Sequence, residues 1–280
     1  MRHHRSHRSF VALAIASAVL AASCGSGDGA DEGSTGGAVA VGAPPTEPTT
    51  VTADDGIENV SGVTLVTYDS FPESDTSLND ALDRFTAATG IDVQILVAGD
   101  TGTMLSKAAL TAGNPEGDVM WGIDNSFLSR AIDDDIFEPY LVGGIENIPS
   151  ELTDLVPNGE ATPVDFGDVC VNYDIGWFDD RGLEPPSTLD DLIDPAYAGT
   201  LVVLNPATSS PGLAFLLATI DEYGTDGWQA YWQALGDNGV EVVESWTQAY
   251  YERFTWAGGG PTPMVAVSYT HLRAHETERT

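Results

Sequence analysis

The stretch from Val63 to Val97, VTLVTYDSFPESDTSLNDALDRFTAATGIDVQILV, decides the fold class. Val63–Thr67 and Ile91–Val97 are rich in apolar and β-branched residues, which predicts two strands. Between them, apolar residues recur at helical spacing from Leu78 to Ala88, and Gly90 stands where a helix C-cap belongs. A strand, a helix and a second strand in this order indicate an α/β protein.

The alternation continues toward the C-terminus. The pattern predicts a helix over Leu105–Ala112, a strand over Asp118–Ile123 and a helix over Phe127–Ile132. Strands that alternate with helices imply a parallel sheet covered on both faces. Residues 141–163 contain several Gly, Pro and Asn and are expected to form loops.

The second half of the chain repeats the arrangement. Strands are predicted over residues 164–173, 200–204, 240–243 and 264–267, and helices over residues 213–223, 227–235 and 250–254, with another beginning at residue 189. We therefore expect two α/β lobes, residues 61–163 and residues 164–270.

The charge of the chain is strongly negative. The sequence has 43 Asp and Glu against 10 Lys and Arg, a formal net charge of −33. The bases between residues 25 and 270 are Arg84, Lys107, Arg130, Arg181 and Arg253. Such a surface repels phosphate backbones, which excludes nucleic acid as a partner, and it attracts a cationic solute. Solubility alone also explains an acidic surface.

Histidine and cysteine usage argues against an enzyme. All five histidines lie before residue 8 or after residue 270, so the central region has no imidazole for a triad, a general base or a zinc site. Cys170 lies in the apolar run Val169–Val171 and is expected to be a buried core residue. We expect no catalytic residue, no metal and no cofactor.

Residues 1–23 are typical of a secretory signal peptide. A basic start, MRHHRSHRS, precedes the apolar run of residues 10–20, which is too short for a permanent membrane span. The AASC string ending at Cys24 is similar to a bacterial lipobox, although Ala21 replaces the usual Leu; ordinary signal cleavage is the alternative. Residues 24–60 have few large apolar side chains, so we expect a lipidated Cys24 followed by a disordered tether outside the membrane.

Polar residues stand at two predicted strand ends, where ligands of α/β sheets bind. Tyr68, Asp69 and Ser70 follow the first strand, and Asp124 follows the strand over residues 118–123. Here a carboxylate can face a cation and a tyrosine can contact a ring. Helix capping explains a single Asp after a strand equally well.

Two further groups of residues are candidates for ligand binding. Thr208, Ser209 and Ser210 precede a proline at a predicted helix start, where hydroxyls and amides bind an anion or a hydroxyl group. An ordinary N-cap is the alternative. Trp246 and Tyr250 follow the strand over residues 240–243 and are candidates for stacking on a ligand ring, with core packing as the alternative for Trp246.

Five motifs occur in a fixed order along the chain. They are YDSF at 68–71, WGIDN at 121–125, NPATSSPGLAFL at 205–216, ESWTQAYYERF at 244–254 and VSYT at 267–270. This ordered set resembles the thiamine-binding proteins of bacterial ABC importers, and the resemblance covers residues 62–270.

The resemblance implies a two-lobed periplasmic-binding-protein type II fold of the cluster C clamshell kind. It implies a monomer, not an enzyme, that captures thiamine or thiamine phosphates and delivers them to an ABC importer permease. It also implies that the aromatic pocket of the family corresponds to Trp246 and Tyr269 in this chain.

The last ten residues, HLRAHETERT, differ in composition from the region before them. The string SYTHLRAHET resembles a translated sequencing adapter. We therefore expect residues 271–280 to be non-native, and the resemblance implies that a family member continues further and completes lobe one.

Three other functions are open. Tyr250 and Tyr251 are similar to the adjacent tyrosines of ferric-ion-binding proteins with this fold. A polyamine-binding protein also holds cations with acids and aromatic rings. An exported enzyme would have Cys170 as its nucleophile, but no histidine is available in the central region to activate the thiol.

Overall fold

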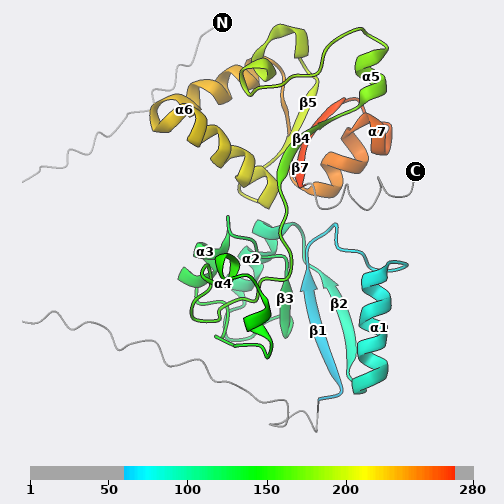
Figure 1. Cartoon of the computed structure of the whole chain (residues 1–280), viewed down its shortest axis with the longest axis vertical. Helices are drawn as coiled ribbons and strands as arrows, with labels where there is room; N and C mark the ends of the chain where they lie inside the picture. The colour runs from blue at the N-terminus through cyan, green and yellow to red at the C-terminus, as the bar shows by residue number, and fades with distance from the viewer. Residues whose placement is uncertain (1–59, 269–280) are drawn as a thin grey trace, which may run out of the picture. The chain divides into compact units, whose positions relative to one another are not determined.

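The computed structural model describes residues 60–268. These residues form two β-sheets, each with its own helices (Figure 1). The predicted signal peptide, Cys24, Tyr269 and the predicted non-native tail lie outside the described residues. Among the described residues no helix is both long and apolar enough to cross a membrane.

The first sheet is parallel, as predicted, with the strand order β2-β1-β3. Its strands are β1 (Gly62–Thr67), β2 (Asp92–Val97) and β3 (Val119–Trp121). The segments between and after them form α1 (Ser77–Thr89), α2 (Thr101–Leu110), α3 (Leu128–Asp133), the 3-10 turn η2 (Ile145–Asn147) and α4 (Ser150–Thr153). This order places the ends of β1, β2 and β3 at one edge of the sheet, where the predicted ligand residues Tyr68, Asp69 and Ser70 begin.

Helix α1 confirms the expectation from its apolar spacing and cap residues. Thr76 and Asn79 form a capping box in which the Asn79 amide donates to the Thr76 side chain, and the Thr76 amide donates to the Asn79 side chain. The C-cap is Gly90 in the left-handed conformation, as predicted. Capping, rather than deep burial, defines this helix, because none of its residues is fully buried.

The second sheet is mixed, with the strand order β4-β7-β5-β6. Its strands are β4 (Val169–Tyr173), β5 (Leu201–Leu204), β6 (Glu241–Val243) and β7 (Met264–Ser268). Strand β4 runs antiparallel to β7, whereas β5 runs parallel to both β6 and β7.

The helical segments around the second sheet include one long helix. They are α5 (Ile175–Asp179), the 3-10 turns η3 (Asp190–Ile193) and η4 (Pro195–Tyr197), α6 (Ser210–Asp237), the π-helical segment η5 (Gln248–Arg253) and α7 (Thr255–Gly258). Helix α6 contains a non-helical residue, Gly224, which separates the two helices predicted for residues 213–223 and 227–235.

The core of the second sheet covers both of its faces. Leu201 and Val203 belong to one buried cluster, and Val202 and Leu204 belong to the other. Because successive strand residues point to opposite faces, a strand buried on both faces is continuously apolar. This explains why β5 appears in the sequence as an uninterrupted apolar run rather than an alternating one.

Two expectations near β4 are wrong. The strand predicted from residue 164 begins only at Val169, and residues 164–168 have no regular structure. Cys170 is an exposed free thiol rather than a buried core residue, because β4 is an edge strand with partners on one side only. Burial, followed by the charge of Asp168, raises the thiol pKa above its ordinary value.

Candidate functional site

The buried carboxyl group of Asp100 is the centre of the candidate site. Asp100 is the N-cap of α2, and the Thr101 amide donates to its Oδ1 at 2.8 Å. The Trp246 amide donates to its Oδ2 at 3.1 Å. The carboxyl therefore joins the start of α2 to the segment that follows β6. The sequence prediction missed Asp100 because it began this helix at Leu105, four residues late.

A second carboxylate, Asp69, lies close to Asp100. Burial raises the pKa of Asp100 to about 6, and the charge of Asp69 adds to this increase, while hydrogen bonds from Thr101 and Trp246 oppose it. The Oδ1 atom of Asp69 is buried and has no hydrogen-bond partner among the described residues. Two carboxylates that interact electrostatically, one with an unpartnered oxygen, form a site that a cation or a cluster of N–H donors would stabilise.

The start of α6 reaches the same carboxyl group. Ser209 is the N-cap residue and is fully buried, but its hydroxyl makes no hydrogen bond of normal geometry. The hydroxyl is nevertheless close enough to Asp100 to lower its pKa. The hydroxyl of Ser210 is also buried and without a hydrogen-bond partner among the described residues. The structure thus links the predicted residue Ser209 to Asp100, and Ser210 is the next residue along the chain.

Helices α2 and α6 meet through their backbones. The Gly102 amide donates to the Thr208 carbonyl at 2.8 Å. A Cβ atom at Gly102 would lie 2.4 Å from the Ala207 carbonyl oxygen, so only glycine permits this approach. Leu213 of α6 packs against the buried cluster that contains Leu105 of α2. The contact fixes the distance between Asp100 and the first turn of α6.

Tyr68 lies against the backbone at the end of β3. A Cβ at Gly122 would be 2.4 Å from the Tyr68 ring, and Gly122 has φ +123°, so a side chain is excluded there. The ring also packs edge-on against Phe71 at 5.8 Å. Burial, followed by the charges of Asp165 and Asp100, raises the pKa of Tyr68 to about 12. Tyr68 is therefore a neutral phenol beside the carboxyl pair.

Trp246 and Tyr250 form a stacked pair within the core. Their ring centroids are 4.6 Å apart with an interplanar angle of 26°. Trp246 is 4% exposed and Tyr250 is 2% exposed, and both belong to the buried cluster around β5 and β7. The backbone of Trp246 touches the site through Asp100, and its ring is largely enclosed by protein. Ring stacking by Trp246 and Tyr250 on a ligand stays a prediction.

The other predicted residues have local partners or lie outside the described region. Asp124 Oδ1 accepts from the amides of Ser126 and Phe127, both at 3.2 Å, and from the Ser126 hydroxyl at 2.7 Å. These bonds stabilise the turn before α3, whose N-cap residue is Phe127 and not Asp124. Ser70 is half-buried in the turn closed by the hydrogen bond from the Phe71 amide to the Tyr68 carbonyl. The role of these two residues and of Tyr269 stays a prediction.

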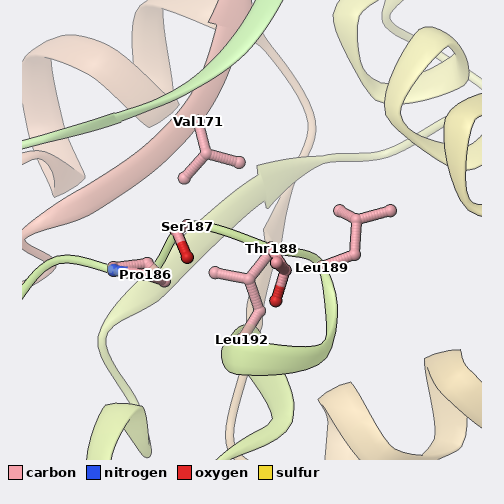
Figure 2. Close-up of a pocket in the computed structure, with 6 residues that line it drawn as sticks. All are labelled: Val171, Pro186, Ser187, Thr188, Leu189 and Leu192. Atoms are coloured by element: carbon pink, nitrogen blue, oxygen red, sulfur yellow. The ribbon is translucent and has the colours of Figure 1, made fainter.

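A separate pocket of about 260 Å³ opens beside η3 (Figure 2). It is lined by Val171, Pro186, Ser187, Thr188, Leu189 and Leu192. The Ser187 hydroxyl and amide both donate to Asp191, so the polar groups at this pocket already have partners. No predicted ligand residue lines it, and we place the candidate site at the carboxyl pair instead.

The chain matches a known family of binding proteins. The sequence model of the family described as "Bacterial extracellular solute-binding protein" matches residues 115–267. The chain therefore belongs to this family of solute-binding proteins, and its members as a class bind solutes rather than transform them.

Individual relatives share part of the chain at moderate identity. The chain is 28% identical over 189 residues to the "Thiamine-binding periplasmic protein" of Salmonella typhimurium, and covers 55% of that protein with 67% of its own length. It is 27% identical over 222 residues to the protein of the same description from Brucella suis, with 78% of this chain and 63% of that protein covered. The chain thus spans somewhat more than half the length of these relatives.

A solved structure confirms the predicted fold. The "Periplasmic thiamin binding protein" superposes with a TM-score of 0.62 at 24% identity, covering 76% of this chain and 63% of that one. This likeness establishes the α/β periplasmic-binding-protein type II fold predicted from the ordered motifs.

Proposed function

We propose that this protein is an extracytoplasmic solute-binding lipoprotein that captures thiamine or thiamine phosphates and delivers them to an ABC importer permease. The observation that carries the proposal is the buried carboxyl of Asp100 together with the half-buried Asp69, whose Oδ1 atom is buried and unpartnered among the described residues. Thiamine combines a cationic thiazolium with an aminopyrimidine that donates hydrogen bonds, and both groups suit carboxylates in a partly dry site.

The surroundings of the pair support an aromatic cation. Tyr68 is held as a neutral phenol beside the carboxylates and offers a ring face or edge. The relatives of this chain in Salmonella typhimurium and Brucella suis are described as thiamine-binding. Aromatic rings and carboxylates also hold polyamines, so it is the description of the relatives that favours thiamine over a polyamine.

Ferric-ion binding has less support. In the adjacent pair Tyr250 and Tyr251, the first residue is 2% exposed within the core and the second is 48% exposed. The two rings meet edge-on at 84° with centroids 5.3 Å apart. Their phenols therefore occupy different environments.

Calorimetric titration with thiamine tests the proposal. The protein is expressed without residues 1–23, the predicted signal peptide. We expect 1:1 binding, which Asp69→Asn and Asp100→Asn weaken by roughly tenfold or more because a charged hydrogen-bond acceptor is worth about 1.5–3 kcal/mol. Asp83→Asn, the same change on the exposed side of α1, is the matched control and keeps the wild-type affinity.

The same titration separates the alternatives. Spermidine and ferric citrate are added as competitors, first at the concentration of thiamine and then well above it. Absence of thiamine binding by the folded protein, or displacement of thiamine by spermidine at equal concentration, contradicts the thiamine assignment.

The lipid anchor requires its own experiment, since Cys24 lies outside the described residues. Cells expressing the protein are labelled with radioactive palmitate and separated into membrane and soluble fractions. We expect label and protein in the membrane fraction, and loss of both in Cys24→Ala. An unlabelled wild-type protein would show ordinary signal cleavage instead.

A further inference from the structure

The start of α6 has the hydroxyl-rich sequence of an anion site, but carboxylates of the same chain surround it. Thr208 Oγ1 donates to the Glu244 carbonyl at 2.8 Å and lies 3.4 Å from Glu244 Oε2. The Asn205 side-chain amide donates to both Glu244 carboxylate oxygens, at 3.3 and 3.1 Å. The Glu244 carboxylate is thereby held at the loop that enters α6.

Asp100 approaches the same helix start from the other side. The Gly102 amide, two residues after Asp100, donates to the Thr208 carbonyl at 2.8 Å, and the buried N-cap hydroxyl of Ser209 and the charge of Asp69 both act on the pKa of Asp100. The electrostatic contribution of a helix N-terminus equals roughly half a positive charge. Three carboxylates next to this helix start outweigh that partial charge, so the local potential is negative.

The bases among the described residues are engaged elsewhere. Lys107 donates to the Ala98 carbonyl at 2.7 Å, and Arg130 to the Ser106 hydroxyl at 3.0 Å. Arg253 pairs with Glu241 at 2.8 Å, and Arg181 lies over the Trp177 ring at 3.9 Å. Arg84 lies on the exposed side of α1. Within residues 60–268, no hydrogen bond or ion pair joins a base to Asp69, Asp100, Ser209 or Glu244.

Resting on the proposed function, we infer that the site takes unphosphorylated, cationic thiamine and discriminates against thiamine phosphates, with Glu244 as the specificity-determining residue. The buried, unpartnered hydroxyls of Ser209 and Ser210 then serve the neutral hydroxyethyl arm of the ligand. A phosphate on that arm would place its charge beside Asp100 and Glu244 with no compensating base among the described residues.

The test is a comparison of thiamine with thiamine monophosphate by calorimetry at pH 7.5. We expect the wild-type protein to bind thiamine at least roughly tenfold more tightly, since like charges at contact distance near a protein surface repel by that amount or more. Glu244→Gln keeps an acceptor for Asn205 and removes the charge. In this variant thiamine binds more weakly, monophosphate binds more tightly, and the affinity ratio narrows by roughly tenfold.

Glu252→Gln is the matched control. It makes the same change of charge at an exposed position of the neighbouring η5 segment and keeps the wild-type ratio. If Glu244→Gln does not fold, two measurements on the wild-type protein test the inference: the ratio of its affinities for thiamine and thiamine monophosphate, and competition by inorganic phosphate. We expect millimolar phosphate not to inhibit thiamine binding.

The outcomes distinguish this inference from the proposed function. Equal affinities for thiamine and its monophosphate in the wild-type protein, or an unchanged ratio in folded Glu244→Gln, overturn the inference and leave thiamine binding intact. Absence of thiamine binding overturns both.

Discussion

Asp100→Asn should change how the stability of the folded protein depends on pH. The direction of the change is the one expected for a buried carboxyl with a raised pKa. The substitution preserves the shape of the side chain and removes its charge. Each tenfold change in proton affinity corresponds to about 1.4 kcal/mol. Raising the pKa of Asp100 from 3.8 to about 6 therefore means that its ionised form destabilises the folded protein by about 3 kcal/mol at neutral pH.

The sign follows from the direction of the shift. A carboxyl whose folded pKa is raised contributes stability below its unfolded value of 3.8, and this contribution is lost as pH rises through about 6. The asparagine variant has no such loss. It does lose one acceptor, because Thr101 and Trp246 both donate to Asp100, and this costs about 1–3 kcal/mol at every pH.

The assay is urea unfolding of the wild-type protein and the variant between pH 3.5 and 7.5, without ligand. We expect the free energy of unfolding of the variant, relative to the wild type, to rise by about 3 kcal/mol across this range. Asp191→Asn is the control of opposite sign. Hydrogen bonds from Ser187 and Thr188 lower the pKa of Asp191, so its stabilising contribution is present at neutral pH and is lost in acid.

A constant difference between the Asp100→Asn variant and the wild type across this pH range would refute the reasoning. So would a difference that falls as pH rises, because the Asp100 carboxylate would then be stabilised in the folded state. Either result would mean that Asp100 is not a destabilised carboxylate that a bound cation could stabilise.

Three further predictions concern packing and exposure. Gly102→Ala should destabilise the protein by about 1–3 kcal/mol in urea unfolding, because its Cβ would clash with the Ala207 carbonyl. Gly143→Ala is the control and should be nearly neutral, because a Cβ there would have no atom within 4 Å. Equal stabilities of the two variants would contradict the close approach at Gly102. Cys170 should react with iodoacetamide in the native protein because its thiol is exposed. The reaction should be faster above pH 9 than at pH 7, because the raised pKa keeps the thiol protonated at pH 7. Protection of the thiol until the protein unfolds would contradict its exposure. Trp246→Ala should destabilise the protein by about 3–5 kcal/mol because the ring is buried. Thiamine affinity is therefore compared between the wild type and Trp246→Phe. An unchanged affinity in Trp246→Phe would show that the Trp246 ring does not stack on the ligand.

The sequence predicted those elements whose signals are local. Strands β1, β2, β5 and β7 are apolar runs, and their predicted bounds differ from the observed ones by no more than one residue at either end. The cap residues of α1 are also local signals. Pairing partners are not local, and for that reason neither the antiparallel direction of β4 nor its edge position could be predicted. The exposure of Cys170 follows from that edge position.

The start of α2 shows a second kind of limit. Residues Thr101–Met104, TGTM, lack the apolar spacing that indicated a helix from Leu105 onward. The available signal was Asp100 followed by Thr101, three residues after the end of a predicted strand, which is a common N-cap pattern. The same position after a strand drew attention to Asp69 and Asp124, so a consistent search of strand ends would have included Asp100.

The anion preference predicted for residues 208–210 illustrates why a local motif does not determine ligand charge. Serines, free amides and a proline at a helix start favour an anion when their surroundings are neutral. Here Asp100 arrives from α2 and Glu244 from the end of β6, each distant in sequence from Ser209. Both carboxylates reverse the local potential that the motif alone would create. The charge of the preferred ligand therefore follows from tertiary contacts of Glu244 and Asp100, and substitution of Glu244 is the direct way to change it.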